Sequence, residues 1–174
     1  GGDTRRWAGG GTVSVAHPRG ISLPGGGLAE LAAAVKKLGA EDSVVVIVMR
    51  SEGSGAFCAG ASFSELQSIS DEATGKKFFL GFANLIIAMI RCPKFIITRV
   101  QGKTVGGGVG LLAASDYSIA TEQSSVRLSE LAVGIGPFVV GPVIENKIGP
   151  AAFGPLAVGA GWGHRGWARK HGQC

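Results

Sequence analysis

Apolar and polar positions follow two spacings along this chain, one typical of strands and the other of helices. Residues 12–16 alternate as a strand does. Residues 28–38 carry an apolar side chain every three or four positions and are followed by Gly39, which predicts an amphipathic helix after a glycine loop at 25–27. Residues 44–49 form an unbroken β-branched and apolar run, the pattern of a strand covered on both faces. Strand, helix and strand in this order predict an α/β protein.

The rest of the chain continues the same two spacings. Ser70 and Asp71 are suitable caps for a long helix over 72–91, and Pro93 follows its end. The other predicted elements are strands at 95–100, 116–120 and 125–128, and helices at 63–69, 106–114, 140–148 and 151–158.

Length and composition predict a single domain. The chain has 174 residues, 45% of them hydrophobic, which is enough to form a sizeable core. Glycine occurs 30 times and crowds both ends of the chain. We therefore expect one domain over residues 12–158, with irregular ends at 1–11 and 159–174.

Charge and cysteine content limit the partners. The net charge of +5 favours anionic ligands, but the lysines and arginines are scattered, so nucleic acid is not the expected partner. Three cysteines without metal-ligand spacing predict a cytoplasmic protein in a reducing compartment, and no metal site is expected.

The longest apolar stretch, residues 78–90, is shorter than the roughly 20 residues that a membrane span needs. No secretory signal is visible at the start.

Two glycine-containing turns follow two of the predicted strands. One covers residues 56–62 and the other residues 102–108, where Gly106, Gly107 and Gly108 precede a helix. Backbone N–H groups in such turns suit an anion or a developing oxyanion, because the unpaired donors and the helix dipole favour negative charge. Taken alone, however, three glycines are also explained by a tight turn or by close packing.

The two turns together resemble the signature of the crotonase family, the enoyl-CoA hydratases and isomerases. The matching segments are Phe57-Cys58-Ala59-Gly60-Ala61 and the stretch from Val100 to Gly108, in the same order and at a similar separation. The resemblance continues through 116–120 and 128–137 and covers roughly residues 12–158. It implies a crotonase-like spiral of ββα units.

The resemblance also implies where an acyl-CoA thioester would bind. In the family, two backbone N–H groups surround the thioester carbonyl oxygen, and they correspond to those of Ala61 and Gly107. The implied contacts with the CoA thioester are Ala59, Gly60, Ala61, Ser62, Phe63, Gly106, Gly107 and Gly108. An acyl pocket has apolar candidates whose spacing equally fits plain core, and we assign none of them: Phe63, Leu66, Phe82, Ile86, Leu112 and Phe138.

One glutamate matches the catalytic positions of the family. Hydratases typically use two, and only the later one is present here, as Glu130 in the motif Leu128-Ser129-Glu130. Gly110 stands where the first would be. A single carboxylate can move a proton between two carbons of a bound acyl chain, so the resemblance implies an isomerase slightly ahead of a hydratase of acyl-CoA breakdown. A non-catalytic relative that binds CoA or RNA is the remaining alternative.

The expected partners follow from the same resemblance. Coenzyme A would enter as part of the substrate, with no separate cofactor, and the reaction would belong to fatty-acid metabolism. Family members form trimers or hexamers, so a homo-oligomer is expected. Their chains continue into further helices, whereas this sequence stops at Cys174.

Overall fold

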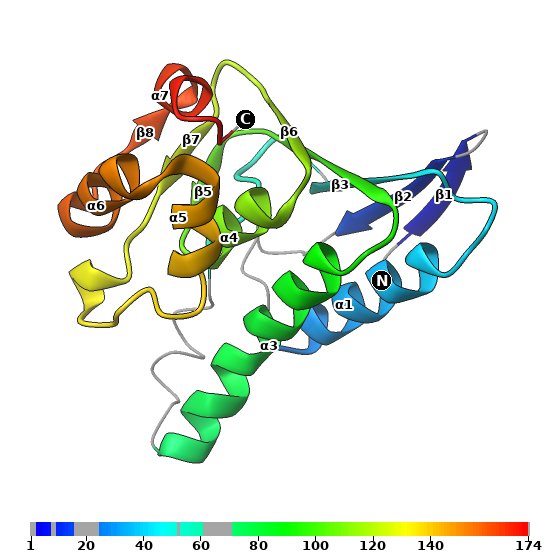
Figure 1. The fold of residues 1–174 in the computed structure, drawn as a ribbon, viewed down its shortest axis with the longest axis horizontal. Coiled ribbons are helices and arrows are strands. Elements are labelled where there is room, and N and C mark those ends of the chain that lie inside the picture. Colours follow the sequence, from blue (N-terminus) through cyan, green and yellow to red (C-terminus); the bar gives the residue numbers. More distant parts are fainter. Residues whose placement is uncertain (1–2, 8–9, 16–24, 52, 61–70, 174) are drawn as a thin grey trace.

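The computed structural model describes residues 3–7, 10–15, 25–51, 53–60 and 71–173. A five-stranded sheet runs through one half of the molecule (Figure 1). Its strands in spatial order are β1 (Asp3–Trp7), β2 (Gly10–Val15), β3 (Val46–Ser51), β4 (Phe95–Val100) and β6 (Tyr117–Ala120). The first pair is antiparallel and the other pairs are parallel. Parallel neighbours joined by helices confirm the α/β prediction.

A second, smaller sheet lies beside the first in the other half of the molecule. It consists of β5 (Lys103–Val105), β7 (Ser125–Arg127) and β8 (Gly163–His164), in that order. β5 and β7 are parallel, while β8 is antiparallel to β7. The sequence pattern predicts β7 but neither β5 nor β8, because two or three residues are too few to show an alternation.

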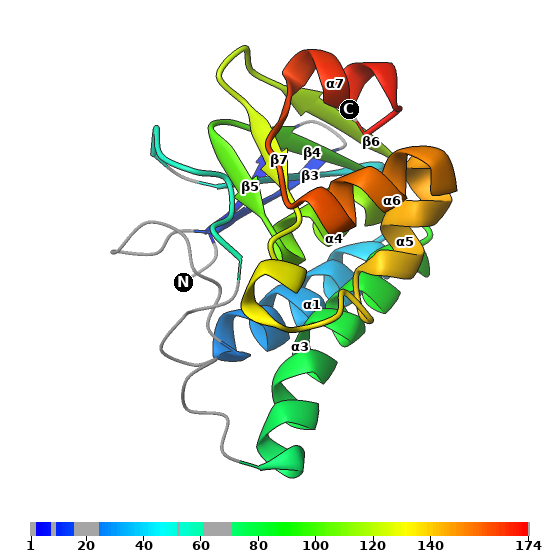
Figure 2. The same cartoon turned by 90° about the vertical axis from the view of Figure 1, so that its left-hand side faces the viewer.

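The helices pack on the two sheets and on one another. Figures 1 and 2 show α1 and α3 side by side against the large sheet, with the later helices near the small one. Their bounds are α1 (Gly25–Gly39), α3 (Glu72–Ile90), α4 (Gly107–Ala114), the 3₁₀ turn η1 (Leu131–Val133), α5 (Gly141–Ile148), α6 (Pro150–Gly159) and α7 (Arg165–Lys170).

Helix α3 shows why the local sequence signals succeed. Its N-cap is Asp71, whose carboxylate accepts a hydrogen bond from the Thr74 N–H at 2.7 Å, as the sequence predicts. Length and composition alone would allow this helix to cross a membrane. Its side chains Phe82, Leu85 and Met89 are buried in the core, which is the role expected of a core helix.

Two predictions, the irregular ends and the glycine loop at 25–27, need correction. The ends are not irregular, because residues 1–11 include β1 and the start of β2, and residues 159–174 include β8 and α7. Strand pairing uses main-chain groups, so glycine-rich segments such as Gly10 and Gly11 can still pair with β3. Glycines 25–27 form the first turn of α1 rather than a loop. The predicted helix at 63–69 and the cap Ser70 lie outside the described residues.

Within the described residues, one face of the large sheet is buried and the other face is only partly covered. In β3 the buried residues Ile47 and Met49 alternate with half-buried Val46 and Val48, so the expected burial on both faces is wrong. The register pairs Val46 with Phe95, which is 51% exposed. An apolar run therefore does not by itself show that both faces of a strand are packed.

Candidate active site

The two glycine turns lie side by side at the start of the small sheet. The Val105 N–H donates to the Cys58 carbonyl at 2.8 Å, and the Cys58 N–H donates to the Lys103 carbonyl at 3.4 Å. Cys58 thereby pairs with Thr104 as a parallel bridge along β5. Gly60 follows with φ of +88°, and a Cβ there would lie 3.1 Å from the Val105 carbonyl oxygen. The first turn thus runs directly along the strand that leads into the second.

The second turn presents the first backbone donors of α4. The Gly106 N–H donates to the Arg127 carbonyl at 2.9 Å, which fixes the turn to β7. Gly106 has φ of +54°, a conformation that favours glycine. Helix α4 begins at Gly107, and the first N–H groups of a helix have no acceptor within it. A Cβ on Gly107 would overlap the Phe82 ring, so only glycine fits between that ring and the helix start.

Glu130 brings a carboxylate to this turn. It precedes η1, and its Oε1 lies 3.2 Å from where a Cβ on Gly106 would stand. Its Oε2 is buried and has no hydrogen-bond partner within the described part of the chain. The Ile135 N–H donates to the Glu130 carbonyl at 2.9 Å and closes the loop that follows. The carboxylate is therefore held at the beginning of α4 with one oxygen free.

Burial changes the acidity of this group. Loss of solvent raises the pKa of Glu130 above its ordinary value of 4.5, and the backbone N–H groups of Glu130 and Ser129 lower it in part. A carboxyl group with a raised pKa exchanges a proton more readily near neutral pH than an exposed one does. Cys58 is also buried, and burial raises the pKa of its thiol to about 11 despite a hydrogen bond with the Gly60 backbone. That thiol is therefore uncharged and a poor nucleophile.

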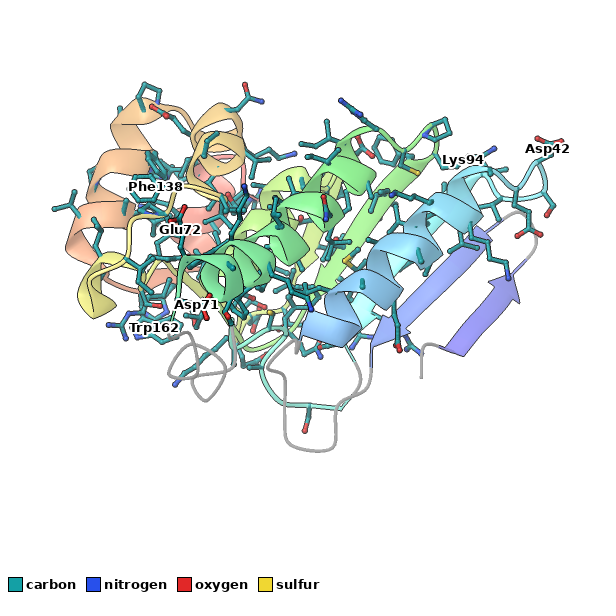
Figure 3. The ribbon with its side chains drawn as sticks, turned by 90° about the horizontal axis from the view of Figure 1, so that it is seen from below. Asp42, Asp71, Glu72, Lys94, Phe138 and Trp162 are labelled. Atoms are coloured by element: carbon teal, nitrogen blue, oxygen red, sulfur yellow. The ribbon has the colours of Figure 1, made fainter. Side chains whose placement is uncertain are left out.

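A cavity of about 430 Å³ opens in front of Glu130 and Gly107. Its walls come from the two turns, from the first half of α3 and from the loop between η1 and α5. Figure 3 labels Phe138, which lies on that loop, on the side of the molecule where α3 begins at Glu72. The described lining residues are Ala59, Gly60, Phe78, Phe79, Phe82, Val105, Gly106, Gly107, Ser129, Glu130, Ile135, Gly136, Pro137, Phe138, Val139 and Val140. Glu130 is the one ionisable side chain among them.

Position 110 has no room for a second carboxylate. A Cβ on Gly110 would lie 2.6 Å from Val140 Cγ1 and 3.3 Å from Ile86 Cδ1. Both neighbours are buried, so a glutamate there would collide with α3 and with the residue that caps α5. The pocket is therefore filled with hydrocarbon at the place where the sequence lacks a glutamate.

The structure brings together most of the predicted site residues that it describes. Ala59, Gly60, Gly106, Gly107 and Glu130 all line the cavity. Gly108 faces away from it, because a Cβ there would lie 2.6 Å from the Cys58 Cβ. Ala61, Ser62 and Phe63 lie outside the described residues, as does Leu66.

The apolar walls were harder to predict. Phe82 and Phe138 line the cavity, whereas Ile86 and Leu112 belong to the buried core. Phe78 and Phe79 also line it, and the sequence carries no signal for this, because apolar residues at helical spacing look the same whether they face a core or a pocket.

Comparison with known proteins agrees with this geometry. The family model for enoyl-CoA hydratase/isomerase matches residues 21–157. Among curated proteins, the mitochondrial 3-hydroxyisobutyryl-CoA hydrolase of Bos taurus is 29% identical over 146 residues, covering 80% of this chain and 38% of that protein. A (7aS)-7a-methyl-1,5-dioxo-2,3,5,6,7,7a-hexahydro-1H-indene-carboxyl-CoA hydrolase of Rhodococcus jostii (strain RHA1) is 32% identical over 120 residues, covering 69% of this chain and 46% of that protein. The chain thus spans less than half the length of these two relatives.

Solved structures show the same fold. An enoyl-CoA hydratase/isomerase (crotonase) of Legionella pneumophila superposes with a TM-score of 0.92 at 27% identity, covering 99% of this chain and 67% of that one. An enoyl-CoA hydratase of Mycobacterium smegmatis gives 0.90 at 25% identity, with 99% and 67% covered. The predicted crotonase fold is therefore confirmed. With its two glycine turns and Glu130 around one cavity, this chain belongs to the enoyl-CoA hydratase/isomerase family.

Proposed function

We propose that this chain acts on an acyl-CoA thioester and moves a double bond along the acyl chain, with Glu130 as the proton carrier. The observation that carries the proposal is the position of the Glu130 carboxylate, 3.2 Å from the Cβ position of Gly106, the residue that precedes the first residue of α4. A base and an oxyanion donor at one end of an apolar cavity suit proton abstraction next to a thioester carbonyl.

The reaction needs one carboxylate. Glu130 removes a proton from C2 of a 3-enoyl thioester, and the electron pair moves into the carbonyl, whose oxygen becomes the oxyanion of a dienolate. The Gly107 N–H donates to that oxygen, and the Ala61 N–H is the second donor that the family resemblance implies. Protonated Glu130 then returns the proton to C4, so the double bond moves from C3–C4 to C2–C3. Coenzyme A takes part only as the carrier of the acyl group.

Hydration is less well supported than isomerisation. Adding water across a double bond in this family uses a second glutamate, and Val140 and Ile86 fill the space beside Gly110 where its side chain would begin. Loss of a single oxyanion donor or carboxylate typically costs a factor of 10² to 10³ or more in rate. A chain with one carboxylate in the pocket is therefore expected to be a poor hydratase.

Thioester hydrolysis is a second candidate, favoured by the two curated relatives, both of which are CoA hydrolases. The same residues could serve it. Glu130 would take a proton from water as the water attacks the carbonyl carbon, and the Gly107 N–H would stabilise the tetrahedral oxyanion before the CoA thiolate leaves and is protonated. This reaction releases a free thiol, whereas isomerisation does not.

A direct test uses trans-3-hexenoyl-CoA as substrate. Isomerisation is followed by the ultraviolet absorbance of the conjugated 2-enoyl thioester, and hydrolysis by a thiol reagent. We expect conjugated product from the native chain and a loss of about 10² to 10⁴-fold in Glu130→Gln. Glu145→Gln on the exposed side of α5 is the matched control and should retain full activity. A Glu130→Gln protein with native turnover would contradict the role of Glu130.

The other outcomes separate the alternatives. Thiol release without conjugated product would replace isomerisation with hydrolysis. CoA binding without turnover of any substrate would favour a non-catalytic relative.

We also propose, from the family resemblance alone, that the chain is a cytoplasmic homo-oligomer, a trimer or hexamer. Sedimentation would test the oligomeric state, and cell fractionation would test the location.

A further inference from the structure

The residues that line the cavity also indicate which acyl group would fit it. Its wall on α3 is made of Phe78, Phe79 and Phe82, packed edge to face: the centroids of Phe78 and Phe79 are 5.3 Å apart, and those of Phe78 and Phe82 are 6.3 Å apart. Such contacts hold the rings in a fixed arrangement. The wall therefore presents a preformed aromatic surface next to Glu130.

Another part of the cavity wall is the loop between η1 and α5, which carries an exposed aromatic ring. Phe138 lines the cavity and is nevertheless 85% exposed, the largest exposed fraction among the bulky apolar side chains that the structure describes. A Cβ on Gly136 would overlap this ring, so the ring lies directly over the backbone of its own loop. Water-exposed aromatic surface at the rim of a pocket gains free energy when an apolar ligand covers it.

The charges around the cavity also favour an uncharged, apolar ligand. Glu130 is the one ionisable group among the described lining residues, and its pKa is raised by burial. No lysine, arginine or histidine is among those lining residues. A carboxylate at the far end of an acyl chain would lose its hydration there without gaining a cation.

We infer that the acyl group is bulky, apolar and uncharged, either a chain of about eight carbons or a shorter one that carries an aromatic ring, and that Phe138 selects it. A cavity of about 430 Å³ lies in the range of pockets for small organic ligands, well beyond the needs of a four-carbon acyl group. The inference rests on the proposed acyl-CoA function but not on which reaction follows.

Binding of unreactive saturated thioesters tests it without any need for turnover. Calorimetric titration would compare butyryl-CoA, octanoyl-CoA and 3-phenylpropanoyl-CoA, and would also compare hexanoyl-CoA with adipyl-CoA, which has the same six carbons and a terminal carboxylate. We expect octanoyl-CoA and phenylpropanoyl-CoA to bind at least tenfold more tightly than butyryl-CoA, and adipyl-CoA at least tenfold more weakly than hexanoyl-CoA.

Variants locate the selectivity. Phe138→Ala should reduce the preference for octanoyl-CoA over butyryl-CoA at least threefold, chiefly by weakening the binding of octanoyl-CoA. Phe95→Ala is the matched control, because Phe95 is 51% exposed on the large sheet and does not line the cavity. Equal affinities for butyryl-CoA and octanoyl-CoA, tight binding of adipyl-CoA, or no binding of any thioester would overturn the inference. The expected ranking in a protein that turns over no substrate would leave the inference standing and refute the proposed reaction.

Discussion

The tight contact between Gly110 and Val140 predicts that any side chain at position 110, where a second carboxylate would stand, destabilises the fold. In Gly110→Ala the new Cβ would lie 2.6 Å from Val140 Cγ1 and 2.9 Å from Val140 Cβ. Overpacking of this kind costs about 1 to 3 kcal/mol, and the value here should be near the upper end because a β-branched side chain cannot rotate freely. Replacing glycine by alanine within a helix returns about 1 kcal/mol. We therefore expect a net destabilisation of about 1 to 2 kcal/mol.

A double-mutant cycle isolates the steric part. Val140→Ala alone removes two buried methyl groups and should cost about 2 kcal/mol. In that background the Cγ1 contact is gone, and the remaining contacts, 2.9 Å with the Cβ of residue 140 and 3.3 Å with Ile86 Cδ1, are relieved by a shift of a few tenths of an ångström. Gly110→Ala should then be close to neutral. The two substitutions should differ from additivity by about 1 to 2 kcal/mol, with the double variant more stable than the sum predicts.

Urea unfolding of the four proteins, followed by circular dichroism, measures these differences directly. Additivity to within about 0.5 kcal/mol would refute the argument that Val140 occupies the space beside Gly110. In that case a glutamate at position 110 would be compatible with the fold, and the case against hydratase activity would have to rest on the sequence alone.

Four further predictions concern Glu130, the Gly106 turn and the two described cysteines. Turnover should fall as the pH drops through the raised pKa of Glu130, because the base must be unprotonated, and this acid limb of the rate profile should be absent in Glu130→Gln. The free energy of unfolding should change with pH in the opposite direction, because the folded state binds the Glu130 proton more tightly than the unfolded state does. This stabilisation is fully present below the pKa of Glu130 in the unfolded state and is lost as the pH rises through its pKa in the folded state. In Glu130→Gln the free energy of unfolding should depend less on pH in this range. Gly106→Ala should cost about 1 to 3 kcal/mol of stability, since φ is +54° there, and should lower turnover because the new Cβ displaces the Glu130 carboxylate. A crystal structure of the variant in which Glu130 has not moved would contradict this. Iodoacetamide at pH 8 should label half-buried Cys92 before buried Cys58, whose pKa is about 11, and mass spectrometry showing native-state labelling of Cys58 first would contradict this.

How well the sequence predicts a structural feature of this protein depends on how close along the chain the interacting residues are. Helix α3 and its cap at Asp71 depend on neighbouring residues, so periodicity and capping rules find them. The position of Glu130 against the Gly106 turn is a long-range contact, and it was accessible only through resemblance to a family in which the two motifs meet. The strands β5 and β8 were missed because their pairing partners, rather than their own side chains, define them.

The cavity walls are another feature that the sequence pattern does not predict. Phe78 and Phe82 lie one helical turn apart on α3, and nothing in that spacing tells a wall from a core. The contact of Gly110 with Val140 joins residues 30 positions apart and has no local signature at all. Packing that depends on how elements meet in space is therefore what the sequence pattern leaves undetermined.

The hydrogen bond from the Ile135 N–H to the Glu130 carbonyl has a consequence for how this protein could change its substrate. It joins Glu130 to Ile135 in the loop that also carries the rim residue Phe138, so we expect a substitution that reshapes the rim to move the Glu130 carboxylate as well. Evolution or engineering toward a new acyl group would accordingly be constrained on that side. Phe79 lines the cavity from a separate helix, α3, so substitutions there can change selectivity without moving Glu130.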